Sequence, residues 1–240
     1  MSGRSRKYIF IIIQLILYSI FLSLDILGIN ISLSNRIKFA VVALCFLYVL
    51  LIKNKNSGKE HFYLLSALAF TVISDILILL TDYYFYGVLT FILAQQLYGM
   101  RITALYNREK AYPISLSGDI PLRIIYQVFF SFLVSVLLWL LGVNIDALLV
   151  VSVFYFICIC TNVVRSLKLF IQYRSKRDIR YFAYGMVLFL LCDINVGLFN
   201  LSSFLPIGGE YETIYNVSSI LMWTFYAPSQ VLIALSGDNY

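Results

Sequence analysis

The chain has 240 residues, of which 61% are hydrophobic and 12% are charged, and its formal net charge is +6. A soluble domain averages about 45–50% apolar and about 25% charged residues, so this composition excludes an ordinary soluble domain and indicates an all-α polytopic membrane protein. The basic residues lie in short patches between apolar runs, which is the pattern of membrane orientation and not of a nucleic-acid surface.

Eight apolar stretches approach the length of about 20 residues that a membrane-spanning helix needs. In chain order they cover residues 8–27, 38–52, 62–81, 86–106, 122–141, 146–167, 181–201 and 217–236. The first stretch follows basic residues, as in a signal peptide, but its apolar region is too long and lacks a small-residue cleavage site. We therefore expect it to be retained, and residues 1–240 to form a single transmembrane helical domain.

The loops between these stretches predict the orientation of the chain. Sixteen of the 18 basic residues are predicted to lie on one side of the membrane. Fourteen of them are at the N-terminus or in the loops after the second, fourth and sixth stretches, and two, Arg101 and Arg123, are at helix ends on the same side. Only Arg36 and Lys38 lie on the other side. Cytoplasmic loops carry the excess of Lys and Arg, so both termini are predicted to be cytoplasmic.

Two acidic residues lie well inside predicted spans: Asp75 in "TVISDILILL" and Asp193 in "FLLCDINVGLF". A charged side chain at the centre of a membrane costs about 2.5–3.5 kcal/mol on insertion scales, so such residues face the bundle interior and commonly mark function. Each lies about seven or eight residues before the outer end of its span, which places both carboxyls roughly 10–12 Å below the outer surface at 1.5 Å per residue. A purely structural role, as protonated carboxyls bonded between helices, is the alternative.

The sequences around the two aspartates resemble one another. Each aspartate follows a small residue, and the next span carries a glutamine and a tyrosine about one helical turn apart: Gln95 with Tyr98, and Tyr226 with Gln230. These spacings place each pair on one helix face. The pattern is consistent with a parallel duplication of spans one to four and five to eight. For these four residues, bonding between helices is an alternative to a role in a site.

Four motifs follow one another in the third, fourth, seventh and eighth spans. They comprise Ser74, Asp75, Leu77, Phe91, Ala94, Gln95, Tyr98, Gly185, Leu188, Phe189, Cys192, Asp193, Tyr226, Ser229 and Gln230. At these residues the chain resembles the YhhN-like lysoplasmalogenase family of integral membrane proteins. Gln95 stands where that family has histidine, and Phe39 follows Lys38 where the family usually has proline. The resemblance covers roughly residues 38–236 and implies an eight-helix bundle that hydrolyses the vinyl ether bond of lysoplasmalogens.

That reaction begins with protonation of an alkene carbon, which needs a carboxylic acid that is protonated near neutral pH. Burial in a medium of low dielectric raises the pKa of a carboxyl in general. A second carboxylate can stabilise the resulting cation and position water, as in glycosidases. The resemblance therefore implies that Asp75 and Asp193 are the catalytic pair, that no metal or other cofactor is needed, and that a membrane lipid is the substrate. The supporting residues would be Gln95, Tyr98, Tyr226, Gln230 and Lys38.

Lys38 has two interpretations, an anchor at the membrane interface or a group that attracts the lipid phosphate, and nearby Asp25 can be solvated or paired with it. Two alternative functions also stay open. Paired intramembrane acids, a possible repeat and Pro228 within the last span suit a proton-coupled transporter. A receptor-like or catalytically degenerate protein of the same fold is the other.

Overall fold

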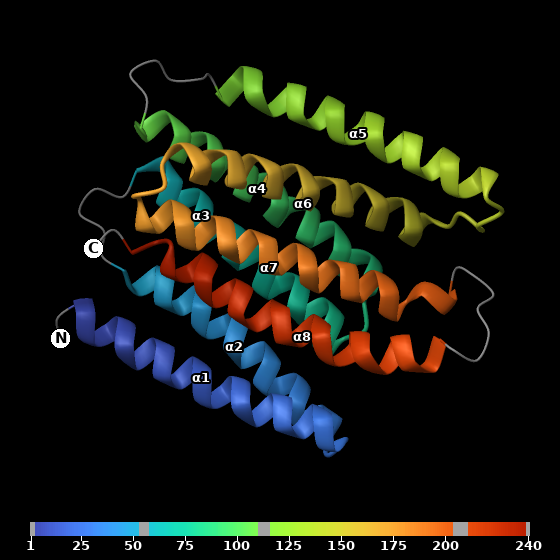
Figure 1. The fold of residues 1–240 in the computed structure, drawn as a ribbon, viewed down its shortest axis with the longest axis horizontal. Helices are drawn as coiled ribbons and strands as arrows, with labels where there is room; N and C mark the ends of the chain where they lie inside the picture. The colour runs from blue at the N-terminus through green and yellow to red at the C-terminus, as the bar shows by residue number, and fades with distance from the viewer. Residues whose placement is uncertain (1–2, 53–57, 110–115, 204–210, 239–240) are drawn as a thin grey trace.

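The computed structural model describes residues 3–52, 58–109, 116–203 and 211–238. All regular secondary structure in these residues is helical (Figure 1). The long helices are α1 (Gly3–Leu27), α2 (Ile31–Leu51), α3 (Lys59–Asp75), α4 (Tyr84–Glu109), α5 (Leu116–Leu140), α6 (Ala147–Gln172), α7 (Arg177–Phe199) and α8 (Tyr211–Leu235). A π-helical turn, η1 (Ile76–Leu80), continues α3, and a short 3-10 turn, η2 (Leu201–Ser203), follows α7.

All eight long helices are long and apolar enough to cross a membrane, which confirms the predicted polytopic all-α membrane protein. The second span was predicted too short, because α2 begins at Ile31 and not at residue 38. Asn30 caps this helix: its side-chain Oδ1 accepts a hydrogen bond from the Leu33 N–H at 3.1 Å. Lys38 consequently lies about two turns inside α2 and not at its start. The helices α5 and α8 also begin several residues before the predicted positions, because a hydropathy criterion omits their more polar first turns.

Six of the helices form a closed ring. α2 packs on α3, α3 on α4, α4 on α6, α6 on α7, α7 on α8, and α8 packs back on α2. α1 lies outside the ring against α2 and α8, and α5 lies outside it mainly against α6 (Figure 1). Both termini lie at one end of the bundle, which we call the terminal end (Figure 1).

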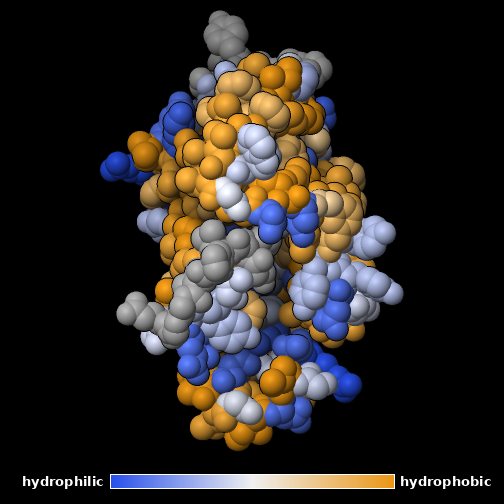
Figure 2. Space-filling view, turned by 90° about the vertical axis from the view of Figure 1, so that its right-hand side faces the viewer, coloured by the Kyte–Doolittle hydropathy of each residue, from blue (hydrophilic) through white to orange (hydrophobic). Residues whose placement is uncertain are grey.

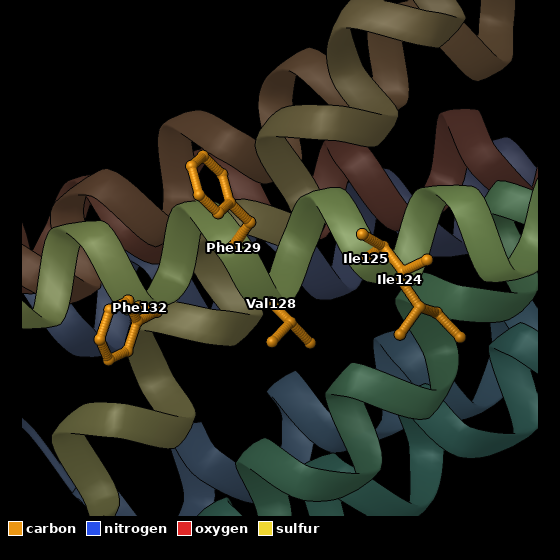
Figure 3. A pocket seen from close by; sticks show the side chains of 5 residues that line it. All are labelled: Ile124, Ile125, Val128, Phe129 and Phe132. Atoms are coloured by element: carbon orange, nitrogen blue, oxygen red, sulfur yellow. The ribbon is translucent and has the colours of Figure 1, made fainter.

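The two outer helices expose much of their apolar surface. On α1, Leu15 is 59% exposed, and on α5, Phe132 is 65% exposed. An open recess of about 440 Å³ on α5 is also apolar, and Figure 3 shows that its lining comes from α5 alone: Ile124, Ile125, Val128, Phe129 and Phe132. Figure 2, which looks at the end opposite the terminal end, shows hydrophobic side chains spread widely and hydrophilic ones in patches. The apolar outer surfaces of α1 and α5 suit contact with lipid.

A proline explains one contact between α1 and the ring. Pro228 has no N–H, so the carbonyl of Thr224, four residues earlier in α8, loses its helical partner. The hydroxyl of Tyr18 on α1 donates a hydrogen bond to this carbonyl at 3.4 Å. A proline within a membrane helix is tolerated where a neighbouring helix satisfies the freed carbonyl, and α1 does so here.

Candidate active site

Asp75 lies where α3 changes from α-helix to the π-helical turn η1. π-helical turns are rare and occur frequently at functional sites. Contacts with α4 hold this turn in place, because the Ser74 hydroxyl donates to the Gly87 carbonyl at 2.6 Å. A Cβ on Gly87 would lie 2.4 Å from Ile78 Cγ1, so only glycine allows η1 to pack this closely on α4.

The Asp75 carboxyl faces the interior of the ring. Asp75 is 3% exposed, and the hydroxyl of Tyr226 donates to its carboxyl, 3.0 Å from Oδ1 and 2.9 Å from Oδ2. Tyr226 belongs to α8 and is itself 4% exposed. Since α3 and α8 are not neighbours in the ring, this hydrogen bond crosses its interior.

Asp193 of α7 has a tyrosine partner of its own. The hydroxyl of Tyr155, on α6, donates to Asp193 Oδ2 at 2.7 Å. Tyr155 is buried, whereas Asp193 is partly exposed. Asp75 is therefore the more deeply buried of the two acids.

Sequence reasoning missed Tyr155. It lies in the aromatic and apolar run "VFYFICIC", where no polar neighbour marks it. The available signal was its position near the middle of a span, because a buried tyrosine hydroxyl usually finds a hydrogen-bond partner.

Phe91 of α4 joins the two tyrosines. Its ring centroid lies 5.7 Å from that of Tyr155 and 6.5 Å from that of Tyr226. Phe189 of α7 completes the cluster, 5.9 Å from Phe91 and 5.4 Å from Tyr226. The two acid–tyrosine pairs thus meet in one aromatic cluster, with Phe91 in contact with both.

The two carboxyls also share an electrostatic environment. Cys192, a buried residue of α7, lies within range of the charges of both Asp75 and Asp193. Burial of both acid–tyrosine pairs around one cluster strengthens such interactions, because the effective dielectric is lower than in water. The structure therefore places the two sequence-predicted aspartates in one region of the ring.

Gln95 lies beside the Asp193–Tyr155 pair. Asn162 Nδ2 donates to the Gln95 backbone carbonyl at 2.7 Å and to its Oε1 at 2.9 Å, which fixes the orientation of the amide. The side chain of Gln95 approaches the Tyr155 hydroxyl. Its Nε2 makes no hydrogen bond within the described residues, so one buried donor remains free next to the pair.

Tyr98 and Gln230 are fully buried but bond to neither aspartate. The Tyr98 ring packs 5.9 Å from Phe182, and its hydroxyl has no hydrogen bond in the part of the chain that the structure describes. Gln230 Nε2 lies 3.4 Å from the Ser229 hydroxyl, and its Oε1 is without a donor there. The two sequence-related pairs therefore have different surroundings, because Tyr226 binds an aspartate and Tyr98 does not.

Lys38 is not an exposed anchor at the interface, since it is 6% exposed. Its Nζ lies 2.8 Å from Asp25 Oδ2 and 4.6 Å from the centre of the Trp223 ring. Trp223 in turn meets the Tyr226 ring edge-on at 5.4 Å. Lys38 thus belongs to the packing behind Tyr226, and its charge is compensated by Asp25.

A closed ring of membrane-spanning helices, with two carboxyl–tyrosine pairs around one aromatic cluster, defines a polytopic membrane protein with a buried two-acid site. The chain belongs to the YhhN family, whose model matches residues 34–237. The match includes both aspartates and both tyrosine partners, and it confirms the family resemblance seen in the motifs. Comparison with curated proteins and with solved structures gave no match.

Proposed function

We propose that this chain is an intramembrane hydrolase that cleaves the vinyl ether bond of lysoplasmalogens to a fatty aldehyde and a glycerophospho-alcohol. The observation that carries the proposal is the pair of acid–tyrosine hydrogen bonds inside the ring, 2.9 Å for Asp75 with Tyr226 and 2.7 Å for Asp193 with Tyr155, joined through Phe91. Membership of the YhhN family supports the same reaction through the lysoplasmalogenase resemblance. The membrane location suits a lipid substrate.

The reaction consumes one water. A carboxylic acid gives its proton to the alkene carbon that does not carry oxygen, and the alkene electrons form the new C–H bond. The ether oxygen and the second carboxyl group stabilise the adjacent cation, and water attacks that carbon while the carboxylate that gave up its proton accepts the water proton. The hemiacetal then collapses: the bond between this carbon and the glycerol oxygen breaks, the glycerol oxygen takes up a proton, and the aldehyde forms. Such proton transfers by positioned side chains contribute about 10²–10⁴-fold to rate.

The two aspartates have different roles in this proposal. Asp193 is the group that meets the reacting atoms, because it is less deeply buried than Asp75. Asp75 stabilises the cation electrostatically from behind Tyr226, in a medium where charge interactions are strong. Gln95 Nε2 is a spare donor for the attacking water or the leaving oxygen.

The proposed orientation, with the terminal end in the cytoplasm, rests on the distribution of basic residues and the positive-inside rule. Both aspartates then lie in the outer half of the membrane. The substrate would be a lipid whose glycerol oxygen reaches this depth.

The test uses the purified full chain in lipid nanodiscs with lysoplasmenyl-ethanolamine, and follows free aldehyde. Wild type is expected to release aldehyde and to leave the saturated alkyl-ether analogue intact. Asp193→Asn is expected to lose about 10²–10⁴-fold in rate. Asp82→Asn is the matched control, because Asp82 is exposed and its positive φ of 57° is one that asparagine tolerates. No aldehyde from wild type at any pH would refute the hydrolase; equal rates for Asp193→Asn and wild type would refute the site.

A further inference from the structure

A second buried polar cluster lies between α4, α5 and α6. Arg123 of α5 is 4% exposed, and the Arg165 side chain of α6 is 25% exposed. Asp119 Oδ2 lies 3.0 Å from Arg165 Nη2 and 3.8 Å from Arg123 Nη1. The Thr103 hydroxyl also donates to Asp119 at 2.6 Å. Two guanidinium groups therefore share one carboxylate.

This cluster carries an uncompensated charge of +1. Asp119 is the only carboxylate within ion-pair distance of either arginine in the described part of the chain. The charges of Arg123 and Arg165 act on one another, which is unfavourable in a medium of low dielectric. A buried charge without a partner is strongly destabilising, so the arrangement favours a further anion.

Three nitrogen atoms of the two arginines are buried and free. Arg123 Nε, Arg123 Nη1 and Arg165 Nη1 have no hydrogen bond within the described residues. Arg123 Nη2 is occupied, since it donates to the Gln96 carbonyl at 3.1 Å and to Gln96 Oε1 at 3.0 Å. The guanidinium of Arg123 is therefore held in place while its other donors stay unused.

Gly99 of α4 makes room for this arrangement. A Cβ there would lie 2.2 Å from Arg123 Nη1 and 3.0 Å from Asn162 Oδ1. Asn162 Oδ1 is itself buried and has no donor among the residues described. Free donors and one free acceptor thus meet beside the backbone of Gly99.

We propose that this cluster binds a phosphate group. Guanidinium groups match phosphate oxygens with forked hydrogen bonds, and two of them offer more donors than a carboxylate ligand would use. Asn162 Oδ1 suits a P–OH or an adjacent ligand hydroxyl as donor. The partly exposed Arg165 provides the approach, and the ligand is either the phosphate of a phospholipid headgroup or a free phosphate. This proposal does not depend on the vinyl ether reaction.

The experiment measures binding of two probes to the delipidated full chain. Inorganic phosphate is titrated in detergent against chloride at equal ionic strength, and phosphatidic acid is compared with diacylglycerol, which lacks the phosphate, by native mass spectrometry. Arg123→Gln and Arg165→Gln are each expected to weaken binding about ten- to a hundredfold, since each removes charge-assisted hydrogen bonds. Binding of phosphatidic acid alone identifies a headgroup site, and binding of inorganic phosphate identifies a free-phosphate site; both support the proposal.

Arg174→Gln is the matched control, because Arg174 is exposed and the variant makes the same charge change. Where Arg123→Gln does not fold, Gly99→Ala replaces it, because this variant displaces the Arg123 guanidinium and keeps its charge. The proposal is overturned if wild type binds neither probe saturably, or if the cluster variants bind as tightly as Arg174→Gln.

Discussion

The hydroxyl of Tyr226 lies 2.9 Å from a carboxyl oxygen of Asp75, although 151 residues separate the two in sequence. The bond connects α3 and α8 across the ring and leaves Asp75 without access to solvent. Tyr155 gives Asp193 a similar bond from a neighbouring helix, but that acid is less deeply buried. The two acids are alike in chemistry and unlike in surroundings.

Tyr226→Phe removes the hydroxyl and keeps the ring packed in the aromatic cluster. Asp75 then loses its hydrogen bond while remaining buried, so we expect a loss of about 1–3 kcal/mol in the free energy of unfolding. Thermal unfolding in detergent measures it. Tyr184→Phe, at a tyrosine that is 47% exposed, should unfold like wild type. An unchanged melting temperature for Tyr226→Phe would show that the bond adds nothing to stability.

Tyr155→Phe should act mainly on catalysis. Without this hydroxyl Asp193 is free to rotate, and loss of one hydrogen bond to a charged group, about 1.5–3 kcal/mol, corresponds to roughly 10–150-fold in rate. Aldehyde release under saturating substrate measures the effect. A change in KM alone, with kcat intact, would contradict a role in positioning Asp193.

Deuterium oxide provides a test of the reaction path. Because the acid transfers a solvent-derived proton to carbon, hydrolysis in D₂O should place one deuterium on the carbon adjacent to the aldehyde carbonyl. Mass spectrometry of aldehyde that has been reduced at once to the alcohol detects it. An aldehyde with no deuterium on that carbon would exclude protonation of the alkene as the first step.

Gly185→Ala tests the close packing of α7 on α8 that positions Asp193. The new Cβ would lie 2.7 Å from Ile233 Cγ1 and 3.0 Å from the Ser229 carbonyl oxygen, so the helices must separate. We expect a loss of about 1–3 kcal/mol in stability. Gly197→Ala on the same helix meets nothing within 4 Å and should be neutral or stabilising, since alanine favours a helix over glycine by up to about 1 kcal/mol. Equal melting temperatures for the two variants would contradict this account.

Lys38→Met leaves Asp25 as a poorly solvated charge without its partner. Breaking a buried ion pair from one side costs about 3–5 kcal/mol, and replacing both partners costs much less. Lys38→Met combined with Asp25→Leu should therefore be more stable than Lys38→Met alone. A double-mutant cycle of unfolding free energies gives the coupling, and additive effects would show that the 2.8 Å contact contributes nothing.

Hydropathy was sufficient to predict the eight spans and to locate the two acids within them, because membrane insertion depends on the composition of each segment by itself. The partners of those acids depend on helix rotation and on which helices are neighbours, and neither property is encoded in a single segment. Tyr155 was missed for this reason. The glutamine–tyrosine spacing singled out Tyr226, which bonds to Asp75, and also suggested an equivalence with Tyr98 that the contacts do not have.

The basic residues show the same limit of prediction from single segments. Arg123 was predicted at a helix end on the side of the basic loops, but it is almost fully buried against α4. The predicted start of α5 omitted its first turns, so Arg123 was assigned to the end of the helix. In the structure it lies about two turns inside α5, where the glycine at position 99 provides space for its guanidinium.

The hydrogen bond between Tyr226 and Asp75 also has a consequence for biosynthesis. Ribosomes add about 5–20 residues per second, so α3 is made roughly 8–30 s before the tyrosine that its carboxyl binds. During that interval the third helix must reside in the membrane with an unpaired acid. The last helix therefore completes the site, and a nascent chain that stops before α8 carries an acid that lacks its tyrosine partner.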